Sequence, residues 1–234
     1  SISAASGNMS ATIGNVNDIK KAALADVKEF YEKYYVPNNA VLTLAGDFEP
    51  EEALRLTEKY FGPVSSGKYD QDELKKSVSF TDKPIAKEIR KVIYDDVQLP
   101  GLFGAYKIPE ENSDEFFVFD ILTDILSTGE SSRLYNELVY KKQMVSDIGC
   151  WVEGRELTGL LHYYAILLPG VRIDEVQDEM DRIFNDAVEG KITERELTKI
   201  KNRIETRNIY RLQTNLSKAD MLSHFKTFYN TPGM

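Results

Sequence analysis

The 234-residue sequence is poor in the side chains that most often bind metals or form disulfides, since it has one cysteine and two histidines. A single cysteine, Cys150, excludes an internal disulfide and a cysteine-based structural zinc site. His162 and His224 lie in neither the H-E-x-x-H motif of zinc helices nor its inverted form H-x-x-E-H. The sequence therefore predicts no catalytic residue and no metal ligand in this chain.

Other catalytic patterns are also missing. No serine lies in a G-x-S-x-G motif, and no glycine-rich segment has phosphate-loop spacing. Neighbouring carboxylates, such as Glu51 and Glu52, point apart on a helix or strand and do not predict paired acid–base chemistry. We interpret His162 as a packed or edge residue of an apolar strand, and Cys150 as a small buried apolar side chain.

Basic charge is scarce, because the formal net charge is -9 and the isoelectric point is near 4.9. This balance argues against nucleic acid or an anionic membrane as a partner, since both require a basic surface. The longest apolar run, residues 160–168, is far shorter than the roughly 18 residues of a membrane span. Residues 1–10 show no basic segment followed by an apolar core. The compartment stays open between bacterial periplasm and cytoplasm.

Hydrophobic spacing and punctuation residues predict the secondary structure. Helices are expected over residues 17–35, 50–60, 113–126, 131–140 and 173–188, and from 193 to about 228 with a break. Strands are expected over residues 40–45, 88–94, 102–108, 145–153 and 160–168, and a polar surface connection over 65–83. Because strands occur in adjacent pairs, we predict an α+β fold: a two-layer sandwich with a mainly antiparallel sheet and helices packed on one face.

Two local interactions can be predicted from residue types. Thr193 and Glu196 have the spacing of a capping box at a helix start. Ser131 or Ser132 is expected to cap the helix predicted over residues 131–140, and Arg133 is expected to brace neighbouring backbone or carboxylates.

Three ordered motifs resemble the insulinase/pitrilysin/mitochondrial-processing-peptidase superfamily of inverted-zincin metallopeptidases. The first contains Pro37, Asn38 and Asn39, an apolar run, Gly46 and Asp47, and then Tyr60, Phe61 and Gly62. The second is Ser131, Ser132, Arg133, Leu134 and Tyr135, and the third is the Ile192–Leu197 segment that opens a long helix. We single out Asn38, Asn39, Gly46, Asp47, Ser132, Arg133 and Leu134 as structural motif residues.

The resemblance implies that the chain is the second, non-catalytic domain of a peptidase half. Residues 1–14 would then be a lead-in from the preceding zinc-binding domain, and residues 15–234 the second domain, truncated at its C-terminus. Zinc would be a cofactor of the parent protein only, with its ligands and catalytic base upstream. The Arg and Tyr with which the family's other half holds the substrate carbonyl would align with Val139 and Ser146, which cannot do that work.

The expected function is therefore to shape the substrate chamber of a zinc metalloendopeptidase, with this chain inactive alone. Its partners would be the zinc-bearing domain, a second peptidase half or subunit, and a peptide substrate. The alternative is a non-catalytic assembly or interaction subunit of the same family, and a third interpretation is an unrelated α+β binding domain. An H-x-x-E-H motif upstream would distinguish the first from the second.

Overall fold

The computed structural model describes residues 16–67 and 85–231, and the chain divides into two compact units. Unit 1 combines Ser1–Asp82 with Ile209–Met234, and unit 2 is Lys83–Asn208. The predicted domain boundary after residue 14 lies outside the described residues, so that boundary stays a prediction.

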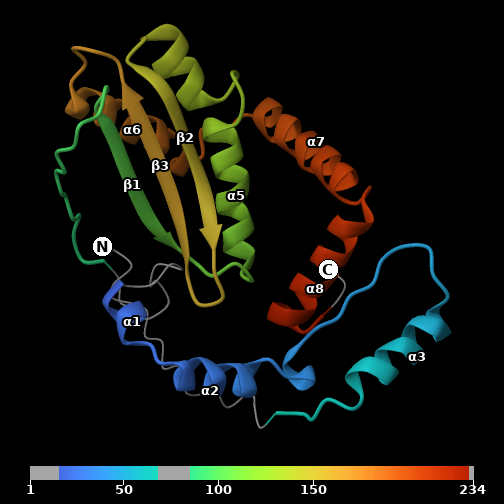
Figure 1. Ribbon diagram of the computed structural model, residues 1–234. Coiled ribbons are helices and arrows are strands. Elements are labelled where there is room, and N and C mark those ends of the chain that lie inside the picture. Colours follow the sequence, from blue (N-terminus) through green and yellow to red (C-terminus); the bar gives the residue numbers. More distant parts are fainter. Residues whose placement is uncertain (1–15, 68–84, 232–234) are drawn as a thin grey trace. The chain divides into compact units, whose positions relative to one another are not determined.

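Unit 2 is built on a three-stranded antiparallel sheet in the order β1-β3-β2 (Figure 1). The strands are β1 (Gly101–Ile108), β2 (Val145–Gly154) and β3 (Gly159–Leu167). β3 lies in the centre and pairs with both neighbours. The predicted strands at residues 102–108, 145–153 and 160–168 are confirmed, because each combines an apolar alternation with an antiparallel neighbour.

Two helices of unit 2 pack on one face of this sheet. Figure 1 shows α5 (Asp114–Ser127) along β2 and α6 (Ile173–Val188) behind the strands. Their buried side chains form one core with alternate residues of the strands. This core contains Phe116 and Leu126 from α5, Val176, Met180, Ile183 and Ala187 from α6, Ile108, Val145, Ile148, Cys150, Leu161, Ala165 and Leu167 from the sheet, and Leu134 and Leu138 from the segment between α5 and β2. The α+β class with helices on one face is therefore confirmed.

The remaining helices of unit 2 connect this core to the rest of the chain. A helical turn at Arg133 leads into η3 (Tyr135–Lys141), which is a π-helix, and α7 (Glu194–Arg211) follows α6. Ile200 of α7 is buried. Among the described residues, no helix combines the length and the apolar character that a membrane span requires.

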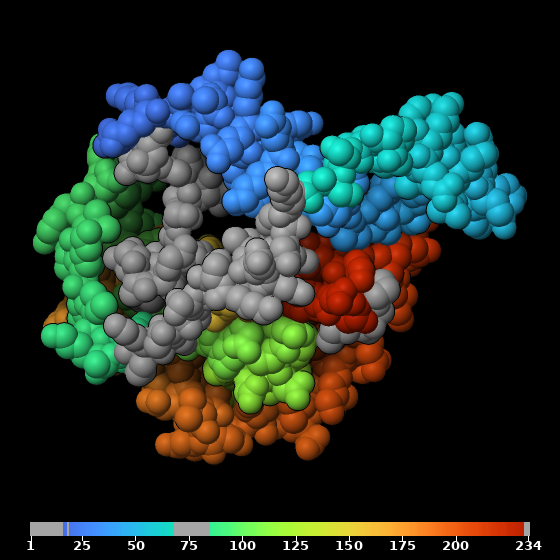
Figure 2. All heavy atoms as spheres, turned by 90° about the horizontal axis from the view of Figure 1, so that it is seen from below, coloured from blue at the N-terminus to red at the C-terminus, as the bar shows by residue number. Residues whose placement is uncertain are grey.

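Unit 1 consists of short helices. They are α1 (Val16–Lys21), α2 (Leu24–Tyr34), the 3-10 turn η2 (Pro37–Asn39), α3 (Pro50–Phe61) and α8 (Asn215–Tyr229). None of the described residues of unit 1 is buried. Figure 2 shows the surface of α3 in cyan. Unit 1 therefore has amphipathic helices without a core among the described residues.

Four expectations need correction or stay open. The strands predicted at residues 40–45 and 88–94 do not form, because a β-strand requires a paired neighbour as well as an apolar pattern. The helix predicted over 17–35 is two helices, since Ala23 has an extended backbone and donates its N–H to the Asp26 carboxylate (2.8 Å). The surface connection predicted over 65–83 lies almost wholly outside the described residues.

Candidate functional site

The predicted motif residues of unit 1 stabilise turns. The Asn38 side chain exchanges two hydrogen bonds with the backbone of Gly67, at 2.9 and 3.0 Å. Asn39 donates to the carbonyl of Tyr34 (2.9 Å), at the last residue of α2. Gly46 and Asp47 form the bend before α3. These residues position backbone, and none of them is arranged to act on a substrate.

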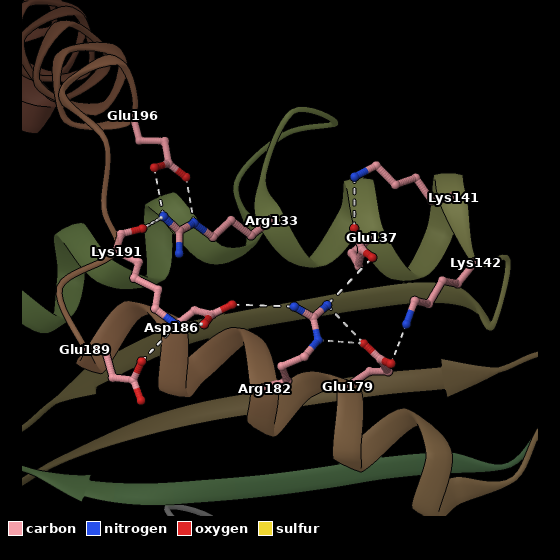
Figure 3. Close-up of polar contacts among 10 residues, drawn as sticks. All are labelled: Arg133, Glu137, Lys141, Lys142, Glu179, Arg182, Asp186, Glu189, Lys191 and Glu196. Atoms are coloured by element: carbon pink, nitrogen blue, oxygen red, sulfur yellow. Dashed lines mark hydrogen bonds and ion pairs between the residues drawn. The ribbon is translucent and has the colours of Figure 1, made fainter.

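Arg133 forms a polar junction between two segments of unit 2 (Figure 3). Its guanidinium donates two hydrogen bonds to the Glu196 carboxylate, at 2.6 and 2.8 Å, and a third to the carbonyl of Lys191. Glu196 also accepts the backbone N–H of Thr193 (2.8 Å), and Thr193 Oγ1 accepts the N–H of Glu196 (3.3 Å). The predicted capping box and the predicted bracing role of Arg133 are both confirmed, and they meet in one carboxylate.

This junction is partly shielded from solvent, because the Arg133 side chain is 18% exposed and that of Glu196 is 28% exposed. The Arg133 guanidinium, with smaller contributions from Thr193, lowers the pKa of the Glu196 carboxyl to about 2. A bidentate arginine–carboxylate pair is among the stronger hydrogen-bonded contacts of proteins. The arrangement therefore fixes the start of α7 to the segment that precedes η3.

A chain of ion pairs continues from this junction along α6 (Figure 3). Arg182 lies within 3.7 Å of Glu137 of η3 and contacts Glu179 and Asp186 on its own helix. Lys142 pairs with Glu179. A shallow depression of about 240 Å³ lies between η3 and α6, and every charged residue that lines it has an ion-pair partner. These partners leave no free charge to bind a substrate.

A second contact holds α7 further along its length. Arg207 of α7 lies 3.5 Å from Asp120 and 3.7 Å from Asp124, both on α5. Burial raises the pKa of the Asp120 carboxyl, and Arg207 opposes that shift. Sequence reasoning missed this contact, because the 87 residues that separate Asp120 from Arg207 carry no local signal.

The serines beside Arg133 do not cap a helix as predicted. Ser131 Oγ accepts a hydrogen bond from Lys199 (2.8 Å), and the buried Ser132 Oγ has no hydrogen-bond partner among the described residues. Leu134 is fully buried in the core. The predicted motif therefore contributes one anchor, Arg133, and one core residue, while the capping expectation was wrong.

The two histidines lie in separate units and have different surroundings. His162 of β3 forms a 2.9 Å hydrogen bond with Glu153 and stacks on Trp151, with ring centroids 5.0 Å apart. His224 of α8 contacts the rings of Phe225, Phe228 and Tyr229. Each imidazole contacts aromatic rings of its own unit, which supports the interpretation of His162 as a packed residue.

Cys150 is buried, as the sequence predicted, with 7% of its surface exposed. Burial raises the pKa of its thiol to about 11, so the thiol stays protonated and unreactive near neutral pH. Within residues 16–67 and 85–231, no three His, Cys, Asp or Glu side chains are grouped closely enough to hold a metal ion. The described side chains therefore do not fit the zinc site of a peptidase.

The positions that the resemblance aligns with the substrate clamp are occupied by apolar and small side chains. Val139 of η3 packs against the core, and the Ser146 hydroxyl donates to the carbonyl of Ile166 (3.2 Å). Sequence reasoning missed two backbone features nearby. η3 is a π-helix, and Gln143 has a left-handed backbone with φ of 51°.

The fold and these contacts place the chain in a class of protein domain: an α+β domain whose motif residues pack the core and position the backbone. The model of the family described as "Peptidase M16 inactive domain" matches residues 21–204, which is most of the chain. The chain therefore belongs to this family of inactive M16 peptidase domains, and the resemblance inferred from the three motifs is confirmed.

Individual relatives agree with this assignment. The chain is 26% identical over 215 residues to zinc protease PqqE of Helicobacter pylori, covering 91% of this chain and 48% of the relative. It is 22% identical over 185 residues to the uncharacterized zinc protease ML0855 of Mycobacterium leprae, covering 79% and 40%. The chain thus spans about half the length of the curated relatives it matches, or less.

Solved structures show the same fold. A protease from Helicobacter pylori is similar with a TM-score of 0.75 and 26% identity, and the match covers 93% of this chain and 52% of that one. A peptidase M16 inactive domain from Pseudomonas fluorescens is similar with a TM-score of 0.70 and 17% identity, covering 95% and 51%. The second likeness, at this identity, concerns the fold alone.

Proposed function

We propose that this chain is a non-catalytic wall of the substrate chamber in a zinc metalloendopeptidase. The observation that carries the proposal is the match to the inactive-domain family over residues 21–204, together with relatives about twice as long that are named zinc proteases. In this proposal the zinc ligands and the catalytic base lie upstream in the parent protein. Zinc would be bound there, where it would activate a water molecule for attack on the peptide carbonyl.

The chemistry of the described residues is consistent with a non-catalytic role for this chain. Peptide hydrolysis requires an activated nucleophile and a group that stabilises the developing oxyanion. His162 is held by Glu153 and Trp151, and Cys150 is protonated and buried. Neither side chain is available as a nucleophile or base, so no catalytic step is assigned to this chain.

The exposed apolar side chains of unit 1 indicate a surface that a partner covers. The helices of this unit expose large apolar side chains, including Leu24, Phe30, Leu54 and Tyr60, each between 57% and 71% exposed. The apolar run at residues 40–45 forms no strand, although Val41, Leu42 and Leu44 suit one. We infer that the zinc-bearing domain of the parent protein covers these surfaces. A second peptidase half would close the chamber around a peptide substrate.

A cleavage assay tests the proposal. A library of quenched fluorescent peptides would be incubated with this chain and with the parent protein, each with zinc and with a chelator. We expect chelator-sensitive cleavage by the parent protein and none by this chain. The control is the parent protein with His162→Ala, which should keep its zinc content. Chelator-sensitive cleavage by this chain alone would overturn the proposal, and cleavage by neither protein would favour the assembly-subunit alternative.

A further inference from the structure

The face of the sheet that points away from the core helices carries a group of aromatic rings. Strand alternation places Leu161 and Ala165 in the core, so their neighbours His162 and Tyr164 point to the opposite face. The cross-strand partners of these two residues are Trp151 for His162 and Phe103 for Tyr164. We call Phe103, Trp151, His162 and Tyr164 the aromatic platform. Phe103 is 71% exposed and Trp151 is 47% exposed.

Contacts between strands hold these rings in place. Trp151 stacks on His162 at 5.0 Å and meets Tyr164 edge-on at 6.1 Å, and Phe103 stacks on Tyr164 at 6.3 Å. Gly149 makes this arrangement possible, because a Cβ there would lie 2.7 Å from the Tyr164 ring. The platform is therefore ordered before any ligand arrives, which lowers the entropic cost of binding.

One end of the platform has a carboxylate that lacks a cation. Asp147 accepts hydrogen bonds from the Tyr164 hydroxyl (2.8 Å) and from the backbone N–H of Ile148 (3.0 Å). Among the described residues, no lysine or arginine pairs with it. At the other end, by contrast, Glu153 is already bonded to Arg155 (2.8 Å) and His162 (2.9 Å). The platform therefore has one free negative charge beside exposed ring faces.

This combination matches the chemistry of a cationic side chain. A guanidinium or ammonium group binds a carboxylate and also the face of a tyrosine or tryptophan ring, and an arginine or lysine stem packs on apolar surface. Along β2, Asp147, Gly149 and Trp151 alternate with core-facing residues, and the ring of Tyr164 from β3 lies over Gly149. The platform therefore presents a carboxylate and two aromatic rings in a row, at intervals of two residues. This row spans four residues of strand, or about 13 Å, and each of its two steps of about 6.6 Å equals the distance between alternate side chains of an extended peptide.

We propose that the aromatic platform binds an extended peptide segment with one arginine or lysine, followed or preceded by apolar side chains two and four positions away. The cationic group would bind Asp147, and the apolar side chains would lie on Tyr164 and Trp151. The inference rests on the proposed function for one point, namely that the ligand is a peptide. It adds a location and a side-chain preference that the chamber proposal does not contain.

Trp151 makes the test direct, because it is the only tryptophan of the chain. The 234-residue chain would be titrated with a blocked peptide containing Arg-Thr-Leu-Thr-Leu, while the emission of Trp151 is recorded. A matched peptide with Glu in place of Arg is the control ligand. We expect a saturable change with the arginine peptide, protection of Trp151 from acrylamide on binding, and an affinity that falls as salt is added.

Variants locate the bound cation. Asp147→Asn should weaken the arginine peptide about fivefold, which corresponds to loss of roughly one exposed charge contact. Asp178→Asn, at an exposed position of α6, is the matched control and should leave the affinity unchanged. Equal binding of the two peptides, no effect of Asp147→Asn, or a Trp151 that acrylamide cannot reach in the free protein would each overturn the proposal.

Binding and hydrolysis are measured separately, so the two proposals can fail separately. Saturable binding of the arginine peptide by this chain, with no cleavage by the parent protein, would support the platform and reject the peptidase proposal. Chelator-sensitive cleavage by the parent protein, with no response of Trp151 in this chain, would support the peptidase proposal and reject the platform.

Discussion

The two units of this chain differ in where they place their apolar side chains. Every buried residue among those described lies between Ile108 and Ile200, within unit 2. Unit 1 also has amphipathic helices, but none of its described side chains is buried, and many of its large apolar side chains are exposed. The comparison shows that an amphipathic pattern forms helices in both units, whereas a core forms only where a second layer covers the apolar face.

Hydrogen exchange should show the largest contrast between the units. We expect the amides of β3 to exchange only through global unfolding, because β3 is paired on both sides and its core-facing side chains are buried. The amides of α2 and α3 should exchange at least about a thousandfold faster, since few apolar contacts protect them. Comparable protection in both units of the isolated chain would contradict the difference drawn between them.

Matched truncations in the two units should differ by several kcal/mol. Leu167 is fully buried in β3, so Leu167→Ala should lower the free energy of unfolding by about 2–5 kcal/mol. Leu42 is 54% exposed in unit 1, and Leu42→Ala should change it by less than about 0.5 kcal/mol. Urea unfolding followed by Trp151 emission measures Leu167→Ala, and unfolding followed by far-ultraviolet circular dichroism, which reports the helices of both units, measures Leu42→Ala. A large cost for Leu42→Ala would reveal a core in unit 1.

The Arg133 junction sharpens the comparison, because unit 2 also uses a partly buried ion pair. Arg133→Ala should lower the free energy of unfolding by about 1–3 kcal/mol, since the Glu196 carboxylate loses its bidentate partner. Arg133→Lys should recover only part of that loss, because lysine cannot form the planar two-point contact. An unchanged melting temperature for Arg133→Ala would argue against the anchor.

The pH dependence of stability gives the same junction a second readout. The Glu196 carboxyl has its pKa lowered from 4.5 to about 2 in the folded chain. Because the folded pKa is the lower one, this contribution is present above pH 4.5 and is lost as the pH falls toward 2. Arg133→Ala should therefore reduce the loss of stability over that range in acid titrations. An acid slope identical to that of the parent sequence would count against this assignment.

The smallest predicted effect is a gain. Gln143 has φ of 51°, a left-handed conformation that disfavours side chains with a Cβ. Gln143→Gly should raise the free energy of unfolding by up to about 1 kcal/mol, because glycine adopts this conformation without strain. The gain is limited because glycine also makes the unfolded chain more flexible, which favours unfolding. Gly170→Ala, at φ of 82° with open space around it, is the opposite substitution and should destabilise. A loss of stability with Gln143→Gly would show that its side chain matters more than its backbone.

Local chemistry was sufficient to predict much of unit 2. The helix over residues 173–188 was predicted with both ends correct, because its apolar spacing and flanking residues agree. The Thr193–Glu196 capping box was also predicted, since its two partners lie three residues apart. The sheet followed for a similar reason, because a short polar turn joins β2 to β3 and antiparallel pairing of neighbours is the simplest outcome.

Contacts between distant residues could not be predicted in the same way. The helix cap expected from Ser131 or Ser132 does not form, and the pairing of Asp120 with Arg207 was not predicted. The strands expected at residues 40–45 and 88–94 have suitable composition but form no ladder. An apolar, β-branched composition indicates that a segment can form a strand, but it does not show whether a neighbouring strand is available to pair with it.

The sequence alone therefore determined the class of the chain: an α+β inactive domain of M16 type with a bracing arginine, read from short-range patterns and ordered motifs. Only the tertiary structure decided which apolar faces form a core, which carboxylate Arg133 binds, and which aromatic side chains gather on the open face of the sheet. The physical reason is the separation along the chain of the residues that interact. Capping, periodicity and turns act over a few residues, whereas burial and cross-strand contact depend on residues that folding brings together from far along the chain.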